Sequence, residues 1–191
     1  MEAFLRALLP RLLSRDRSFQ VHPFQGKGDL LGKLQARLRG YAKWLPDDWR
    51  IVVVVDRDDE DCRNLKQRLE AIAASAGLLT RSQANGRPWQ LANRIAIEEL
   101  EAWYFGDWTA VCSAYPRVST SVPSKTGFRV PDAIRGGTWE AFEHVLQRYG
   151  YFKTGLPKIE AARSVGAEIV PGRNHSLSFV TFRDALLEAT A

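Results

Sequence analysis

Residues 51–61 read IVVVVDRDDED, a run of apolar residues followed at once by a cluster of acids. The β-branched run from Ile51 to Val55 predicts a strand buried on both faces, which is typical of the interior of a parallel sheet. Ligands of open α/β sheets gather at the carboxyl ends of the strands. Carboxylates crowded at such a place repel one another unless solvent, protons or a cation offset their charges. The stretch therefore predicts an α/β fold with a divalent metal site.

Asp56 and Asp58 are the metal ligands that this pattern predicts. If strand geometry persists to Asp58, the two side chains point the same way. Paired carboxylates suit Mg²⁺, with Mn²⁺ as the alternative, because Mg²⁺ prefers oxygen ligands and keeps several waters for a substrate phosphate. Such an ion polarises a phosphoryl oxygen and activates water. Asp59, Glu60 and Asp61 have a simpler interpretation, since acids in the first turn of a helix complement its dipole.

A second group of acids lies in RIAIEELEAWYFGD, residues 94–107. Glu98 and Glu101 are three residues apart and share a helical face, and Glu98 follows the alternating residues Ile95 and Ile97 near another strand end. Both glutamates are candidate catalytic residues that complete or orient the metal site. The alternative is that Glu98 begins a helix and Glu101 faces solvent, and for Glu99 we favour that alternative.

Four residues are candidates for holding nucleic-acid phosphate. Lys27 lies in a Gly-Lys-Gly turn that lacks the spacing of a P-loop, so an intrinsic ATPase is not indicated. Arg94 precedes Glu98, and either neutralises that acid or holds a phosphate. Arg173 and His175 follow a Pro-Gly pair in a loop, which leaves them free to reach a site. His175 is a candidate general acid or base, or simply a neighbour of a helix cap.

Composition limits the class of protein without identifying it. The chain has 191 residues, a net charge of +5 and a pI of about 9.4, and its basic residues crowd positions 6 to 50. This charge mildly favours a polyanionic partner, although solvated helix faces explain it equally well. No apolar run approaches the roughly 20 residues that cross a bilayer. Cys62 and Cys112 suit a reducing cytoplasm rather than a disulfide framework.

Hydrophobic periodicity predicts one domain, residues 1–191, with an α/β core at 1–115 and a helical, irregular C-terminal elaboration at 116–191. The core is a mostly parallel central sheet flanked by helices. Strands are predicted at 18–24, 50–56, 78–81 and 89–97. Helices are predicted at 2–14, 29–44, 60–76, 98–105, 108–115, 138–149, 156–165 and 178–189.

Several longer stretches carry a family resemblance over nearly the whole chain. They are HPFQGKGDLLGKL, VVVVDRDDEDCRNLK, RIAIEELEAWYFGD, PDAIRGGTWEAFE, GLPKIEAAR and RNHSLSFVTFRDAL. On these motifs the chain resembles the toprim-like proteins of the domain-of-unknown-function family 4276. The resemblance implies a toprim fold, a Mg²⁺ site in which the D-x-D maps onto Asp56 and Asp58, and phosphodiester chemistry on nucleic acid. It also implies an AAA-type ATPase as partner in a phage-defence or DNA-processing system.

The resemblance also implies a hydrophobic first strand ending in a catalytic Glu, followed by a helix like EAFLRALLPRLL. This chain starts at that helix, so we expect it to lack the first strand and its Glu: either both lie before Met1, or this version of the family does without them. The leading hypothesis is a Mg²⁺-dependent nuclease, an enzyme whose activity depends on that Glu being supplied. The alternative is a non-catalytic module that docks an ATPase or nucleic acid. An aspartyl phosphoacceptor ranks last, because the lysine and hydroxyl that it needs at later strand ends are not evident.

Overall fold

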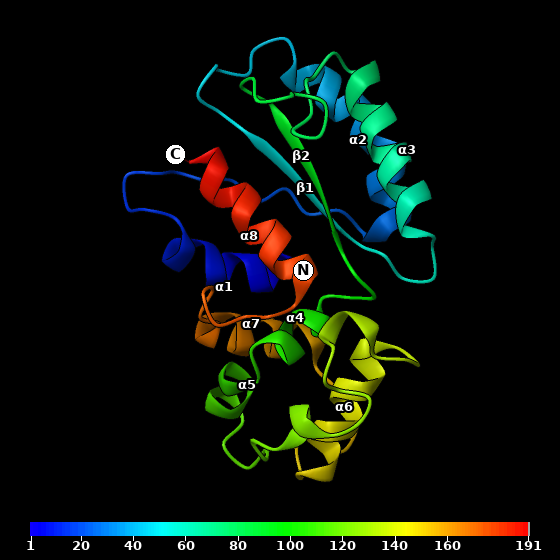
Figure 1. Ribbon diagram of the computed structural model, residues 1–191, viewed down its shortest axis with the longest axis vertical. Coiled ribbons are helices and arrows are strands. Elements are labelled where there is room, and N and C mark those ends of the chain that lie inside the picture. The colour runs from blue at the N-terminus through cyan, green and yellow to red at the C-terminus, as the bar shows by residue number, and fades with distance from the viewer. Residues whose placement is uncertain (191) are drawn as a thin grey trace.

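A parallel pair of strands lies between helices in the upper part of the computed structural model, which describes residues 1–190 (Figure 1). β1 (Ile51–Asp56) pairs with β2 (Leu91–Ala96), in a register that runs from Ile51 opposite Leu91 to Asp56 opposite Ala96. The helices are α1 (Glu2–Leu12), α2 (Gly26–Tyr41), α3 (Cys62–Ser75), α4 (Glu101–Gly106), α5 (Trp108–Ala114), α6 (Thr138–Arg148), α7 (Lys158–Glu168) and α8 (Leu177–Ala189). Short 3₁₀ turns lie at η1 (Val122–Ser124) and η2 (Pro131–Ala133).

Both faces of β1 are covered, as its β-branched run predicts. Val53 and Val55 belong to a core cluster that α2 and α3 complete with Leu34, Leu65 and Leu69. The alternate residues of β1 pack against a second, larger cluster, to which α1, α4 and α8 contribute. Figure 1 shows the same layering, with α2 and α3 on one side of the strands and α1 and α8 on the other. Period-two alternation of side chains therefore joins β1 to two separate cores.

The sheet is smaller than the sequence predicts. Within residues 1–190 it has two strands, and helix is the dominant secondary structure. The predicted strand at 78–81 is reduced to an isolated bridge between Thr80 and Leu91. The predicted strand at 18–24 is not a strand, because its backbone has no ladder partner in the described chain. The predicted helices are confirmed, with ends shifted by at most three residues.

The C-terminal helices pack against the N-terminal half. α8 lies against β2, and the ring of Phe182 stacks on Trp103 of α4 with centroids 4.9 Å apart. α7 lies against α1, where Gly166 approaches the backbone of Phe4. No helix in the described part of the chain is long and apolar enough to cross a membrane.

The close approach of α7 to α1 yields a stability prediction. A Cβ added at Gly166 would lie 3.0 Å from the carbonyl oxygen of Phe4. We therefore expect Gly166→Ala to lower the free energy of unfolding by about 1–3 kcal/mol. Gly32 in α2 is the matched control, since a Cβ there meets nothing within 4 Å. Gly32→Ala should raise stability by up to about 1 kcal/mol through helix propensity. Urea denaturation measures both, and equal effects would contradict the packing.

Candidate metal centre at the end of strand β1

Asp56 closes β1 and brings a carboxylate into the interior. Its Oδ1 atom is out of contact with solvent and has no hydrogen-bond partner among the described residues. Burial raises the pKa of Asp56 to about 6; the ammonium group of Met1 lowers it, and the charges of Asp58 and Glu99 raise it further. An enclosed carboxylate oxygen without a donor is costly. The end of β1 therefore presents an unsatisfied acceptor with acids around it.

Glu101 is the second buried acid of this region. It lies in the first turn of α4 and its residue surface is 7% exposed. Burial raises the pKa of Glu101 to about 7, and the charges of Asp56 and Glu99 contribute in the same direction. The sequence predicts Glu101 as part of the site, and the structure places it close enough to Asp56 for their charges to interact. The alternative interpretation, a solvated helix residue, does not describe this buried side chain.

Tyr104 is a site residue that the sequence analysis missed. Its hydroxyl is buried without a hydrogen-bond partner in the described chain, and burial raises its pKa well above the usual value, with Glu101 and Asp56 adding to the shift. The spacing of Glu101 and Tyr104 was the available signal, because residues three apart share a helical face. The side chains of Glu101, Asp56 and Tyr104 thus lie in one buried region.

Asp58 does not continue the strand. β1 ends at Asp56, and Asp58 takes a left-handed backbone conformation with φ 50° while its N–H donates to the carbonyl oxygen of Glu98 at 2.9 Å. The condition for parallel D-x-D side chains, an unbroken strand, is therefore not met. Asp58 is exposed, yet its charge still raises the pKa of Asp56. The two carboxylates remain neighbours through the turn rather than through strand alternation.

Lys27 supplies a cation at the turn of residues 57–61 between β1 and α3, which we call the acidic turn. Its Nζ lies 2.8 Å from the carbonyl oxygen of Arg57, 3.0 Å from Asp58 Oδ2 and 3.6 Å from Glu60 Oε2. α2 begins at Gly26, whose φ of 87° lets the chain turn into the helix just before Lys27. No group of three or more His, Cys, Asp or Glu residues in the described chain is arranged to hold a metal ion. An ammonium group therefore already neutralises the outer part of the acidic turn.

Glu98 and Glu99 have protein partners. Glu98 forms an ion pair with Arg57 and has a left-handed backbone with φ 62°. Glu99 accepts hydrogen bonds from Thr138 Oγ1 at 3.1 Å and from the Trp139 N–H at 2.9 Å. Glu98 therefore contacts the acidic turn through its ion pair with Arg57. Glu99 instead binds the first residues of α6.

Arg94 lies apart from Glu98. Its residue surface is 8% exposed, and it donates from Nη1 to the carbonyl oxygen of Asn93 at 2.8 Å. Burial lowers its pKa, with a further contribution from Arg81, while Glu188 and Glu70 oppose the shift. These charged neighbours come from α3, α8 and the loop before β2. The Arg94 side chain therefore lies near Glu70 and Glu188 and does not neutralise Glu98.

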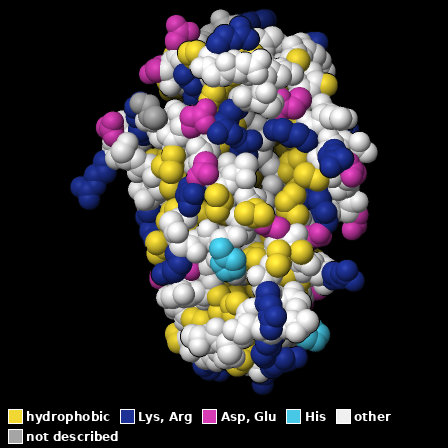
Figure 2. Space-filling view, viewed as in Figure 1, with side chains coloured by type: hydrophobic (Ala, Val, Ile, Leu, Met, Phe, Trp, Pro, Cys, Tyr) yellow, Lys and Arg dark blue, Asp and Glu magenta, His cyan; other side chains and the backbone are white. Residues whose placement is uncertain are grey.

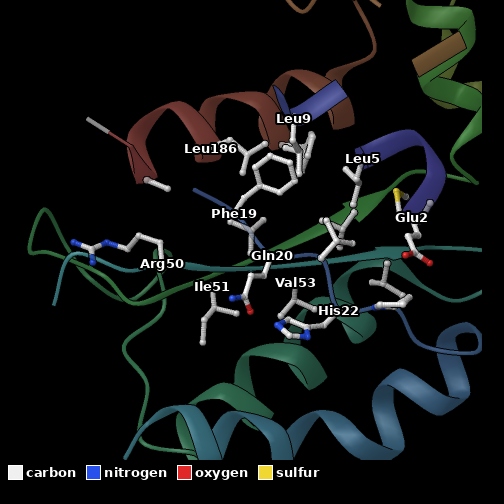
Figure 3. A pocket seen from close by; sticks show the side chains of 18 of the residues that line it. Glu2, Leu5, Leu9, Phe19, Gln20, His22, Arg50, Ile51, Val53 and Leu186 are labelled. Atoms are coloured by element: carbon white, nitrogen blue, oxygen red, sulfur yellow. The ribbon is translucent and has the colours of Figure 1, made fainter. Parts of the chain in front are cut away.

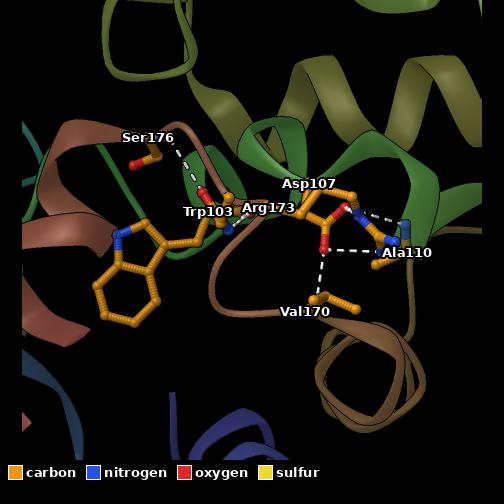
Figure 4. A network of polar contacts seen from close by, with 7 residues as sticks. Trp103, Asp107, Ala110, Val170, Arg173 and Ser176 are labelled. Atoms are coloured by element: carbon orange, nitrogen blue, oxygen red, sulfur yellow. Dashed lines mark hydrogen bonds and ion pairs between the residues drawn. The ribbon is translucent and has the colours of Figure 1, made fainter. Parts of the chain in front are cut away.

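Arg173 belongs to a structural network around Asp107 (Figure 4), and His175 lies in the same loop. Buried Asp107 accepts from Arg173 Nε at 2.5 Å and from Nη2 at 3.0 Å, and also from the N–H of Val170 at 2.8 Å. The His175 N–H donates to the carbonyl oxygen of Gly106 at 3.0 Å. The predicted free loop is thus fastened to the ends of α4 and α5, and Arg173 is already paired with a carboxylate.

Three basic side chains pair with the acids around the end of β1: Lys27 with Asp58 and Glu60, Arg57 with Glu98, and Arg68 with Glu60. Figure 2 shows Lys and Arg spread over both halves of the visible face, with hydrophobic side chains in its middle. Of the predicted phosphate-binding residues, Lys27 alone contacts the acidic turn.

The Asp107 network yields a prediction. Asp107→Ala leaves Arg173 and the Val170 N–H without their acceptor, so we expect a loss of about 3 kcal/mol in the free energy of unfolding. Asp184→Ala is the matched control, because Asp184 pairs with Arg183 at the surface and its side chain is 48% exposed. The control should cost less than about 1 kcal/mol. Similar losses in denaturant titrations would show that the network does not hold the loop.

The buried acids predict the pH dependence of stability without added metal. The pKa values of Asp56 and Glu101 are raised to about 6 and about 7, so the folded state binds more protons than the unfolded state between roughly pH 4 and 7. The contribution of these two acids to stability is fully present below this window and is lost, by roughly 2–4 kcal/mol, as pH rises through it. Asp56→Asn should flatten the profile in chelator-treated protein. A wild-type profile that rises from pH 5 to 8 would contradict this placement.

Comparison with known proteins gives one match. A family described as Domain of unknown function (DUF4276) matches residues 1–187. No curated protein and no solved structure matches the chain. The match covers both cores, the acidic turn after β1 and the loop fastened by Asp107. The chain therefore belongs to the DUF4276 family.

Proposed function

We propose that the chain is a Mg²⁺-dependent, toprim-like phosphodiesterase that cleaves nucleic acid, with Asp56 and Asp58 as metal ligands. The observation that carries the proposal is the enclosed Oδ1 of Asp56, which lacks a donor at the carboxyl end of a buried parallel strand. The parallel pairing of β1 and β2 and the acids that follow β1 agree with the toprim-like arrangement that the sequence resembles. Mn²⁺ is the alternative ion.

The carboxylate oxygens of Asp56 and Asp58 suit a hard cation that takes only some of its ligands from the protein. Asp56 and Asp58 offer carboxylate oxygens, which Mg²⁺ prefers, and no group of three or more His, Cys, Asp or Glu residues in the described chain is arranged to hold the ion by itself. Mg²⁺ is commonly held by one or two carboxylates, with water and substrate phosphate in the remaining positions. When bound, the ion supplies polarisation of a phosphoryl oxygen and activation of water. The open coordination positions thus suit a phosphate substrate.

The remaining roles fall to residues beside these acids. Glu101, with a pKa near 7, accepts a proton from water at neutral pH. Lys27 Nζ, 3.0 Å from Asp58, would hold a phosphate oxygen of a substrate that lies beside Asp58. Glu98 orients the turn through Arg57. Arg94, Arg173 and His175 have no role in this proposal, because the first is directed elsewhere and the other two lie in the fastened loop.

A second candidate is a non-catalytic module that docks nucleic acid or an AAA-type ATPase. The observation in its favour is the position of Lys27, whose ammonium already neutralises Asp58 and Glu60. An acidic turn with its own cation holds together without a metal ion. A phage-defence or DNA-processing role applies to either candidate.

Metal binding separates the two candidates. Isothermal titration of the wild-type chain should show Mn²⁺ and Mg²⁺ binding, and Asp56→Asn or Asp58→Asn should weaken it at least about tenfold through loss of a charged ligand. Asp59→Asn is the matched control, because Asp59 is an exposed neighbouring acid. Cleavage of labelled single-stranded DNA, duplex DNA and RNA should follow the same order and stop with chelator. Cleavage unaffected by Asp56→Asn would overturn the enzyme proposal, and absence of metal binding would favour the docking module.

A further inference from the structure

Trp139, near the start of α6, is an aromatic side chain that the hydrophobic cores do not use. The buried tryptophans Trp89, Trp103 and Trp108 each donate an indole N–H to an acceptor of the protein. Trp139 is partly exposed, and among residues 1–190 its indole has no acceptor and belongs to none of the core clusters. A tryptophan that is neither packed in a core nor hydrogen-bonded is typical of a binding surface.

Lys158 holds its ammonium group over this indole. Lys158 Nζ lies 3.9 Å from the centroid of the Trp139 ring, which is a cation–π contact. Lys27 is paired with two carboxylates, whereas Lys158 forms no ion pair within residues 1–190. Lys158 is also the first residue of α7, which begins with no capping side chain in the described chain. The free N–H groups and the dipole of a helix N-terminus favour an anion, so an unpaired ammonium at this place suits a phosphate.

The position of Lys158 over the ring is fixed by the backbone. Glu143 lies one helical turn after Trp139, on the same face of α6. Its Oε1 accepts from the Leu156 N–H at 2.6 Å, two residues before Lys158. The loop that leads into α7 is therefore held against the face of α6 that carries Trp139, and Lys158 follows directly from this contact.

Trp139 and Lys158 lie beside the buried acids. The Trp139 N–H donates to Glu99 Oε2 at 2.9 Å, and α6 packs against α4, which carries Glu101. Burial raises the pKa of Asp56, and the charge of Glu99 adds to that shift. Burial also raises the pKa of Glu101, and the charge of Lys158 partly offsets it. The ammonium group and the indole are therefore close enough to the acids to contact a substrate that reaches them.

The apolar cavity along β1 does not include these two residues. It has a volume of about 730 Å³, extends along β1 as far as Asp56, and has Leu5, Leu9 and Leu186 among its lining (Figure 3). Neither α6 nor α7 contributes to its lining. Trp139 and Lys158 thus form a separate surface, and a ligand that binds them does not need the cavity.

We propose that Lys158 and Trp139 bind single-stranded nucleic acid beside the buried acids, with a phosphate on the Lys158 ammonium group and a base stacked on the Trp139 indole. The inference rests on the proposed phosphodiesterase function and names the form of its substrate. As the ammonium group moves from the ring to a phosphate, the face of the indole becomes available to a base. Bases in a duplex are stacked on one another and do not offer their faces, so this pair of residues favours a single strand.

The test compares two fluorescent oligomers by anisotropy, oligothymidine and an abasic strand with the same number of phosphates, both in chelator so that no cleavage occurs. The wild-type chain should bind oligothymidine at least about fivefold more tightly than the abasic strand, because only the former supplies a base to stack. Trp139→Ala should abolish this difference, and Trp139→Phe, which keeps an aromatic ring, should retain most of it. Lys158→Gln should weaken both oligomers by a similar factor of at least about threefold, because it removes a phosphate contact.

Trp44→Ala and Lys43→Gln are the matched controls, because both residues are exposed and lie outside α6 and α7. Both controls should keep the wild-type preference for oligothymidine. Equal binding of the two oligomers by the wild-type chain, or a preference that survives Trp139→Ala, would overturn the proposal. These outcomes are independent of metal binding, so they leave the enzyme proposal standing. Loss of metal binding at Asp56 with an intact preference for bases would overturn the enzyme proposal alone.

Discussion

The parallel pairing of β1 with β2 is the constraint on which the rest of the structure depends. The ladder holds β1 between two hydrophobic clusters that otherwise have separate members. The ladder also sets the residue at which β1 ends, which is Asp56, and places its carboxylate in a buried position. This register also sets the geometry of the acidic turn. The Arg57 N–H donates to the carbonyl oxygen of Ala96 at the end of β2, and the Asp58 N–H donates to that of Glu98 just after it.

The acids at the end of β1 and the start of α4 form an exposed group and a buried group, and the two groups differ in what balances their charge. Asp58 and Glu60 lie at the outer part of the turn, where Lys27 balances them. Asp56 and Glu101 lie inside, where burial raises their pKa values and where the Met1 ammonium gives Asp56 only a partial offset. The proposed metal site and the alternative docking module therefore differ in what balances these acids, a bound cation in the first case and Lys27 in the second.

The sequence predicted the elements more successfully than their assembly. The β-branched run of β1 and the 3.6-residue periodicity of the helices are local signals, and both are confirmed. The position of the acids at 56–61 directly after a strand could be predicted, because residue type and sequence order carry that information, whereas their role as metal ligands stays a prediction. Tyr104 was missed, since an apolar-looking aromatic in WYFGD does not show that its hydroxyl lies beside two carboxylates.

Long-range partners explain the other differences. Arg94, Arg173 and His175 were identified as candidates from proximity along the chain, whereas Glu188, Asp107 and Gly106 decide where they lie. The predicted strand at 18–24 has the correct alternation, and what it lacks is a neighbour. Strand propensity is expressed only when a second backbone supplies the ladder.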